Sequence, residues 1–209
     1  MKSTFPIIVC FIFFTGLNKF NAQTLEWAKS FGGTSADIST TIVVDQMGNV
    51  YTTGFFKGTV DFDPSTEISN LNSNGNDDVF VQKMDADGNF LWAKSFGGIS
   101  RDIARCMIVD ETGNVYTTGY YSGTVDFNPS EEFGLLTSEG ENDIFIQKLD
   151  SSGNFIWVKS IGGPTSDEGS SIALDASGNI YSTGYFTGTV DFDIGTGTNS
   201  LTSAGFADI

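Results

Sequence analysis

The sequence contains no histidine, and only 4 of its 209 residues are proline. Without histidine, a serine or cysteine nucleophile lacks its commonest general base, so histidine-dependent nucleophilic catalysis is excluded. Basic residues are also scarce, because 10 lysines and arginines stand against 26 acids and give a formal charge of −16. This negative field repels polyanions, so we expect no nucleic acid among the partners.

Long apolar runs are absent beyond the start of the chain. Residues 5–16 form a short apolar stretch behind a charged start at Lys2, which is typical of a secretory signal peptide. The stretch is shorter than the ~20 residues that span a bilayer, so we expect an exported protein without membrane insertion. We place the signal peptide at residues 1–22, with cleavage before Gln23. A lipoprotein anchor on Cys10 is the competing interpretation, which Val9 disfavours because a small residue should precede the cysteine.

Cysteine is rarer than proline, and Cys10 and Cys106 are the only two in the sequence. Removal of residues 1–22 leaves only Cys106, so we expect no intrachain disulfide in the mature protein. The same cleavage removes two lysines and no acid, which takes the formal charge from −16 to −18. Glycine and phenylalanine, in contrast, are abundant, and the 25 glycines and 19 phenylalanines suit a turn-rich β-protein.

A motif of 65 residues recurs along the chain without insertions. Tryptophans mark its three copies at Trp27, Trp92 and Trp157, each followed two residues later by Lys-Ser. We divide residues 23–209 into repeat 1 (27–91), repeat 2 (92–156) and an incomplete repeat 3 (157–209). The third copy stops inside a segment that runs into a strand in the first two. We therefore expect a fragment of a longer protein.

Glycine-centred turns divide each repeat into hairpins. Five Asp-x-x-Gly-Asn segments lie between apolar runs, at residues 45–49, 85–89, 110–114, 150–154 and 175–179. Aspartate can accept backbone hydrogen bonds across such a turn, and glycine tolerates a positive φ. Two hairpins per repeat predict one four-stranded antiparallel sheet, with strands at 40–44, 50–56, 79–84 and 90–96 in the first copy. Residues 25–30 are predicted to form a further, leading strand.

Repeated four-stranded antiparallel sheets are typical of β-propeller blades, which bury their apolar faces against one another. The predicted fold class is therefore all-β, as a propeller-type array of 65-residue blades that is truncated at its end. Cys106 aligns with Thr41 and Ser171, and we expect a small buried side chain at this position. Recurring lysines, at Lys29, Lys83, Lys94, Lys148 and Lys159, are expected to pair with recurring aspartates.

Four motifs together resemble the bacterial SBBP β-propeller repeat. They are Trp-x-Lys-Ser-Phe-Gly-Gly, Asp-x-x-Gly-Asn-Val-Tyr-Thr-Thr-Gly, Gly-Thr-Val-Asp-Phe-Asp-Pro and Asp-Val-Phe-Val-Gln-Lys-Met-Asp. The resemblance covers residues 25–209. It implies blades of a propeller often taken to be seven-bladed, on exported or cell-surface proteins that frequently end in a sorting module for type IX secretion. It implies no defined reaction.

One recurring motif could bind a cation. Aspartate or asparagine oxygens flank a phenylalanine in every copy, at Asp61 and Asp63, Asp126 and Asn128, and Asp191 and Asp193. Residues two apart on an extended segment point the same way, so each copy could offer two oxygen ligands to Ca²⁺. The alternative is that the first aspartate caps a loop through backbone N–H groups while the phenylalanine packs between blades. Calcium is the one cofactor we consider.

Other motifs have structural explanations. Residues 85–89 resemble the start of an EF-hand loop, but Phe96 stands where its final glutamate should be, so we expect a turn. The Gly32-Gly33 pair and its copies lack a phosphate-binding Lys-Ser/Thr and are predicted linkers. Several further acids, Glu131, Glu132, Glu139 and Glu141, cluster in one variable loop, where solvation explains them better than glycoside hydrolysis.

We therefore expect no enzyme. The predicted function is that of an exported, non-catalytic β-propeller module for binding or scaffolding, secreted or at the cell surface. Its partner would be an extracellular protein or a glycan, contacted by the long segments between second and third strands such as residues 57–77. The alternative is an accessory propeller of a secreted hydrolase whose catalytic domain lies beyond residue 209.

Overall fold

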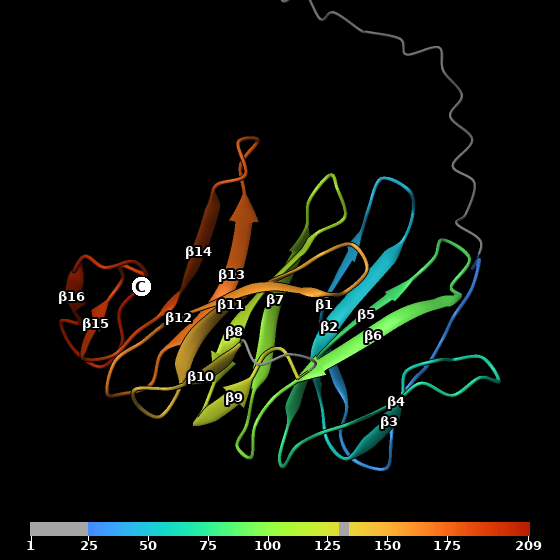
Figure 1. The fold of residues 1–209 in the computed structure, drawn as a ribbon, viewed down its shortest axis with the longest axis horizontal. Helices are drawn as coiled ribbons and strands as arrows, with labels where there is room; N and C mark the ends of the chain where they lie inside the picture. Colours follow the sequence, from blue (N-terminus) through green and yellow to red (C-terminus); the bar gives the residue numbers. More distant parts are fainter. Residues whose placement is uncertain (1–24, 130–133) are drawn as a thin grey trace, which may run out of the picture.

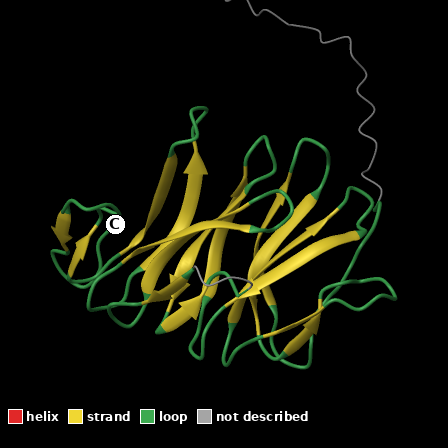
Figure 2. Ribbon diagram, in the orientation of Figure 1, coloured by secondary structure: helices red, strands yellow, loops and turns green. Residues whose placement is uncertain are grey.

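The computed structural model describes residues 25–129 and 134–209. The predicted signal peptide at 1–22, the anchor candidate Cys10 and the acids Glu131 and Glu132 lie outside these residues. The described residues form strands joined by turns and loops, with no helix (Figure 2). Accordingly, this part of the chain offers no helix of the length and apolarity needed to cross a membrane.

Two complete four-stranded antiparallel sheets and one two-stranded sheet follow one another along the chain (Figure 1). The first sheet, blade 1, has the order β1 (Ile38–Val44), β2 (Val50–Phe56), β5 (Asp78–Met84) and β6 (Phe90–Phe96). The second sheet, blade 2, consists of β7 (Ile103–Val109), β8 (Val115–Tyr121), β11 (Asp143–Leu149) and β12 (Phe155–Ile161). The third sheet, blade 3, consists of β13 (Glu168–Leu174) and β14 (Ile180–Tyr185). The predicted all-β fold with repeated four-stranded sheets is confirmed, and the described sheets do not close into a ring.

The segments between second and third strands are more ordered than the sequence predicts. Each contains a short hairpin of its own, so residues 57–77 are not a plain loop. The three hairpins are β3 (Thr59–Asp61) with β4 (Asn70–Asn72), β9 (Thr124–Asp126) with β10 (Leu135–Thr137), and β15 (Thr189–Asp191) with β16 (Ser200–Thr202). In the first hairpin, Thr-Val-Asp of β3 pairs with Asn-Leu-Asn of β4 in a ladder of three residues. Such a ladder is too short to stand out as a strand pattern in the sequence.

The antiparallel order gives the blades two different ends. The Asp-x-x-Gly-Asn turns all lie at one end, which we call the turn face. The short hairpins and the linkers between blades, such as residues 97–102, lie at the other end, which we call the hairpin face. Figure 1 shows the turns of β1–β2, β7–β8 and β13–β14 along its upper edge and the short hairpins along its lower and left edges.

A β-bulge interrupts the first strand of every sheet. The register shifts between Ser39 and Thr41 in β1 and between Ala104 and Cys106 in β7, and β13 has the same shift. A bulge adds one unpaired residue and bends the strand. A glycine of the second strand faces each bulge, because a Cβ on Gly119 would lie 1.9 Å from the carbonyl oxygen of Ile103.

Successive blades pack face to face through apolar side chains. β7 lies beside β1 on one side and beside β13 on the other, so the first strands form the inner edge of the array. One buried cluster joins blades 1 and 2 through Val79, Phe96, Tyr121 and Phe145, among others. A second joins blades 2 and 3 through Tyr116, Ile146 and Ile172. Neither sheet could cover these side chains alone, which is the physical reason for repetition.

The predicted leading strand is wrong, because residues 25–30 form no strand. Among the described residues no neighbouring strand is available to bond it. Its side chains nevertheless lie where an outer strand would place them. The Nε1 of Trp27 donates to the carbonyl of Ala86 (3.0 Å), and Phe31, directly after the segment, packs on Phe62 and Phe80. Side-chain contacts thus hold the segment against blade 1 without a ladder.

Candidate functional site

The carboxylate that precedes each first strand fastens the linker between blades. Asp102 Oδ2 accepts a hydrogen bond from the N–H of Gly98 (2.7 Å), and its Oδ1 accepts one from the N–H of Ser122 (3.1 Å). Asp37 and Asp167 bind their own linkers in the same way. Since backbone donors engage both oxygens of each carboxylate, this set has a structural role.

The residues predicted as calcium ligands lie at the base of the short hairpins. Asp61 Oδ1 accepts hydrogen bonds from the N–H groups of Asp63 (3.1 Å) and Ser69 (2.9 Å). Asp63 Oδ1 accepts one from the N–H of Ser65 (2.9 Å). These bonds cap the loop between β3 and β4, which is the alternative that the sequence left open.

The other copies make the same kind of bonds. Asp126 Oδ1 accepts from the N–H of Asn128 (2.9 Å), and Asn128 is buried. Asp191 Oδ1 accepts from Asp193 N–H (3.0 Å), and Asp193 Oδ1 accepts from Gly195 N–H (2.7 Å). Within residues 25–129 and 134–209, no three acidic, cysteine or histidine side chains are grouped so as to hold a metal ion. Calcium binding by these six residues stays a prediction.

The Asp-x-x-Gly-Asn turns are confirmed. In the EF-hand-like segment, Asp85 Oδ1 accepts from the N–H groups of Asp87 and Asn89, and its Oδ2 accepts from the Asn89 amide. Gly88 has a φ of 76°, which is where glycine is needed. The hydrogen bonds from Asn89 lower the pKa of Asp85, and the nearby charge of Lys29 adds to the shift. Both carboxylate oxygens of Asp85 are therefore engaged in hydrogen bonds within the turn.

The recurring aspartate at the start of the third strand is buried in blades 1 and 2, which was not predicted from the sequence. Asp78 is fully buried, with Oδ2 accepting from the N–H of Asn74 (3.0 Å) and with Oδ1 lacking a hydrogen-bond partner. Burial raises the pKa of Asp78 to about 7, and the charge of Asp102 adds to the shift. Burial also raises the pKa of Asp102, to about 6. The available signal was an aspartate directly before an apolar strand in every copy.

The same arrangement recurs in blade 2. Asp143 is buried, its Oδ2 accepts from the N–H of Glu139 (3.0 Å), and its Oδ1 also lacks a partner. Burial raises the pKa of Asp143, and the charge of Asp167 adds to the shift. Each seam between blades therefore contains two carboxylates that are out of contact with water.

The predicted pairing of Lys83 and Lys148 with aspartates is wrong. The Nζ of Lys83 lies 4.9 Å from the ring centroid of Tyr51, and that of Lys148 lies 4.8 Å from the ring centroid of Tyr116. Lys83 also donates to the carbonyl of Ser151 in the next blade (3.3 Å). An aromatic face attracts an ammonium group as a carboxylate does, and a count of charges cannot tell the two kinds of partner apart.

Cys106 lies on the inner edge rather than in the core. The thiol is half-buried, and its Sγ is 3.8 Å from the Oγ of Ser171 on the neighbouring first strand. The expectation of a buried side chain is therefore wrong, because the first strands form an edge with one open side. In the described residues Cys106 is a free thiol.

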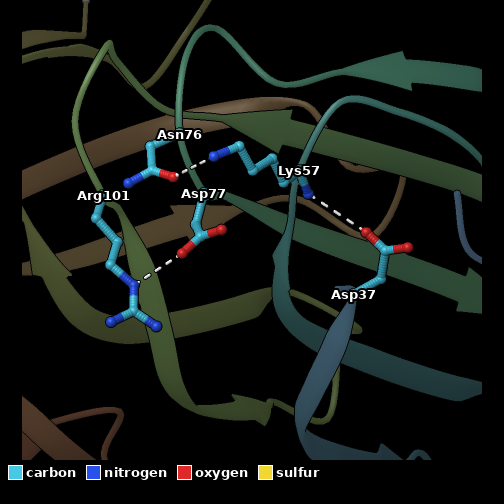
Figure 3. Close-up of polar contacts among 5 residues, drawn as sticks. All are labelled: Asp37, Lys57, Asn76, Asp77 and Arg101. Atoms are coloured by element: carbon cyan, nitrogen blue, oxygen red, sulfur yellow. Dashed lines mark hydrogen bonds and ion pairs between the residues drawn. The ribbon is translucent and has the colours of Figure 1, made fainter. Parts of the chain in front are cut away.

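The hairpin face carries a group of charged side chains at the seam between blades 1 and 2 (Figure 3). Arg101 Nε donates to Asp77 Oδ2 at 2.8 Å. Lys57 donates through Nζ to the amide oxygen of Asn76 (2.8 Å) and through its N–H to Asp37 Oδ1 (3.3 Å). These side chains come from a linker and from both ends of the 57–77 segment.

A second ion pair lies at the seam between blades 2 and 3. Arg105 Nη2 donates to Glu168 Oε2 at 3.1 Å. Arg101 lies over the ring of Phe55 (5.4 Å from its centroid) and Arg105 over that of Tyr120 (5.5 Å). The two rings and Ile103 form one buried cluster, so both guanidinium groups flank the same apolar patch.

The charged groups of both ion pairs affect the pKa of the Tyr120 phenol. Burial raises the pKa of Tyr120, the charges of Arg101 and Arg105 oppose that shift, and the charges of Glu168 and Asp77 add to it. The phenol therefore senses all four charges. The sequence analysis missed this group, although the signal was present, since Arg101 and Arg105 are the only arginines in the sequence and neither recurs at 65 residues.

Comparison with known proteins agrees with this architecture. Two segments, residues 26–54 and 156–189, match the family described as the SBBP β-propeller repeat. The uncharacterized WD repeat-containing protein L264 of Acanthamoeba polyphaga mimivirus is 25% identical over 199 residues, which are 83% of this chain and 14% of that protein. The regulatory protein FlaEY of Caulobacter vibrioides is 25% identical over 119 residues, which are 57% of this chain and 12% of that protein.

This chain thus spans less than a sixth of the length of either relative, and their names speak for those proteins alone. The first matched segment contains β1, its Asp-x-x-Gly-Asn turn and most of β2. The second contains most of β12, followed by β13, its turn and β14. Two segments of the chain thus match the SBBP β-propeller repeat, and the described residues fold as consecutive antiparallel sheets consistent with propeller blades.

Proposed function

We propose that the protein is an exported, non-catalytic binding module that contacts an extracellular partner through its hairpin face. The observation that carries this proposal is a contrast between positions that repeat and positions that vary. The repeated aspartates are engaged in backbone hydrogen bonds, as at Asp102 and Asp85, and so support the frame. Side chains that differ between copies lie on the hairpin face, and variable loops on one face of a repeat array commonly carry binding.

Several of the varying side chains are large, apolar and exposed. Ile99 in the linker between blades 1 and 2 is 83% exposed, Ile68 beside β4 is 75% exposed, and Leu135 in β10 is 65% exposed. Each has a polar counterpart in at least one other copy, since Thr34 corresponds to Ile99, Thr198 to Ile68 and Asn70 to Leu135, although Pro164 and Phe133 are the remaining counterparts of Ile99 and Ile68. The fold therefore does not require an apolar side chain at these positions, and exposed apolar side chains that gather on one face favour contact with another macromolecule.

Export is part of the proposal. Its support is the charged start and short apolar run of residues 1–16, followed by an acidic, turn-rich chain. Fractionation of the producing cells, with N-terminal sequencing of the released protein, tests it. The expected product begins near Gln23 and is found outside the cytoplasm. A product that keeps residues 1–22 and stays in the cytoplasm contradicts export.

Substitutions borrowed from the chain itself test the binding surface. The variant Ile68→Thr, Ile99→Thr and Leu135→Asn places at each position a residue that another copy already has. Met47, which is 76% exposed on the turn face, supplies a matched control as Met47→Thr, because Thr112 is its counterpart. The labelled proteins are applied to glycan arrays and to panels of extracellular proteins.

We expect the triple variant to lose binding by at least about tenfold, as apolar contact residues do when truncated. The control is expected to bind as the unaltered protein does. Equal binding by the triple variant, or loss of binding in Met47→Thr alone, would overturn the assignment of the hairpin face.

A further inference from the structure

We propose that Arg101 and Arg105 form a binding site for a carboxylate-bearing ligand on the hairpin face, at the inner edge of blade 2. This inference rests on the proposed function, because it needs the hairpin face to be a contact surface, and it adds the chemical class of the ligand. Neither arginine recurs at the 65-residue spacing, so the site would be particular to blade 2.

The seams between blades do not need these arginines. At both seams a backbone hydrogen bond joins the blades. The N–H of Asp102 donates to the carbonyl oxygen of Asp77 (2.7 Å), and the N–H of Asp167 donates to the carbonyl oxygen of Asn142 (2.9 Å). Where blades 1 and 2 have the pair of Arg101 and Asp77, blades 2 and 3 have a neutral bond between Asn142 and Ser166 (3.0 Å). An exposed ion pair adds little stability to such a seam.

Arg105 is equally absent from the repeat. Its counterparts are Thr40 and Ser170, and all three residues stand at the β-bulge of a first strand. A bulge redirects a side chain, and bulges are frequent beside binding sites. The frame thus supplies the same redirected position three times, and only blade 2 fills it with a guanidinium.

Both guanidinium groups are fixed from beneath and open to solvent. Arg101 is 53% exposed while its partner Asp77 is 16% exposed, and Arg105 is 43% exposed while Glu168 is 16% exposed. Phe55 supports the first guanidinium and Tyr120 the second. Figure 3 shows the Nη atoms of Arg101 directed away from Asp77 and from the other labelled residues. Such an anchored side chain has little entropy left to lose when it binds.

The chemistry favours a carboxylate. A guanidinium has five N–H donors in one plane, and the bond to Asp77 uses only the Nε of Arg101, so its Nη groups can meet the two oxygens of a second carboxylate. The formal charge of −16 disfavours ligands with many negative charges. A small ligand with one or two carboxylates fits both conditions.

Space for the rest of such a ligand lies beside Glu168. The phenol of Tyr185 has its pKa raised by burial and by a hydrogen bond with Glu168. Tyr185 and Ser166 also line an open hollow, together with Pro164 and Phe206. The hollow, which Glu141 also lines, thus lies beside the glutamate that pairs with Arg105, and its apolar and hydroxyl-bearing walls suit the organic part of a small acid.

The rarity of arginine makes the test direct. In the 209-residue chain, selective ¹⁵N-arginine labelling yields two Nε–H signals in a ¹H–¹⁵N spectrum, one from each residue. Arg101→Lys and Arg105→Lys assign them by removing one signal each. Glutarate is titrated as the dicarboxylate probe, glutaramide as its uncharged analogue and inorganic phosphate as the competing oxyanion. Lys159→Gln, on the outer strand β12, is the matched control.

We expect glutarate to shift both signals to saturation and glutaramide to leave them in place. Each lysine variant should weaken glutarate binding at least about tenfold, because lysine cannot donate two coplanar hydrogen bonds to one carboxylate. The control should bind glutarate as the unaltered chain does. Signals that do not move, that move without saturation, or that respond to phosphate but not to glutarate would overturn the proposal. Should a lysine variant fail to fold, the titration of the unaltered chain still decides.

The outcome also separates this inference from the proposed function. Unmoved arginine signals, together with lost partner binding in the Ile68, Ile99 and Leu135 variant, would refute the carboxylate site and leave the binding face standing. Lost glutarate binding in the two lysine variants together with full partner binding by the triple variant would do the reverse.

Discussion

The indole Nε1 of Trp92, in β6 of blade 1, donates a hydrogen bond to the carbonyl oxygen of Ser151 in the outer turn of blade 2 (3.3 Å). The ring also lies against Gly153, where a Cβ would come within 2.9 Å of it, and meets Tyr51 edge-on at 6.3 Å. One side chain thus joins its own blade to the turn of the next. Trp27 repeats the contact with Ala86.

Replacing this tryptophan should loosen the seam between blades 1 and 2. We expect Trp92→Phe to lower the free energy of unfolding by about 1–2 kcal/mol, because the hydrogen bond and part of the buried ring are lost. Trp157→Phe is the matched control, since the described residues provide no turn that accepts a bond from its Nε1. Urea denaturation of both variants measures the difference. Equal losses would show that the bond to Ser151 contributes nothing.

The aspartate of each turn should matter more than the acid beside it. Asp110 Oδ1 accepts from the N–H groups of Thr112 and Asn114 (2.9 Å each), and its Oδ2 accepts from the Asn114 amide (2.8 Å). We expect Asp110→Ala to cost about 2–3 kcal/mol of stability, because several backbone donors lose their acceptor. Glu111→Ala, one residue further on, should change it by less than about 0.5 kcal/mol. Thermal melts that rank the two variants in the opposite order would contradict this role.

The glycine opposite each bulge should tolerate no side chain. In Gly119→Ala the new Cβ would lie 1.9 Å from the carbonyl oxygen of Ile103. Backbone atoms must move to relieve such a clash, so we expect a loss of about 3 kcal/mol or more. Gly205→Ala, where a Cβ would meet no atom within 4 Å, should be close to neutral. If both variants melt at the same temperature, the bulge geometry described for β7 is wrong.

The buried carboxylates predict an unusual dependence of stability on pH. The pKa of Asp78 is raised to about 7 and that of Asp102 to about 6, so their contribution is greatest at low pH and is lost as the pH rises through these values. In the turns, the pKa of Asp85 is lowered, so its contribution is lost only as the pH falls below its ordinary value. We therefore expect greater stability at pH 5 than at pH 8.

Denaturation by urea at both pH values checks this prediction. Asp78→Asn should flatten the profile between pH 5 and pH 8, because an amide cannot titrate, whereas Asp87→Asn, in an exposed turn, should leave the profile unchanged. A chain that loses stability steadily from pH 8 to pH 5 would show that the seams do not hold protonated carboxylates.

Much of the fold follows from local patterns in the sequence. The turn at residues 85–89 could be predicted because aspartate, glycine and asparagine each have one physical task there, and the strands around it alternate or are uniformly apolar. The 65-residue spacing then implies packing of copies, since Phe96 and Phe145 need a partner sheet. These are properties of single segments and of their repetition.

The remaining features depend on contacts between distant segments. The hairpin of β3 and β4 is held by three residues per strand, and in the described part of the chain no strand pairs with residues 25–30. Lys83 meets Tyr51 rather than a carboxylate because of how the blades stack. The arginine pair could have been noticed from its rarity, but its support by Phe55 and Tyr120 required three dimensions.

Cross-linking of adjacent first strands tests the stacking of blades most directly. The Sγ of Cys106 lies 3.8 Å from the Oγ of Ser171, on the neighbouring blade. In a Cys10→Ser background, Ser171→Cys should therefore form an intramolecular disulfide with Cys106 under mild oxidation, seen by mass spectrometry of the intact monomer. Ser177→Cys, in the turn beyond β13, should not. Complete cross-linking at position 171 alone is the predicted result, whereas free thiols at position 171 or equal cross-linking at position 177 would contradict the arrangement of consecutive blades.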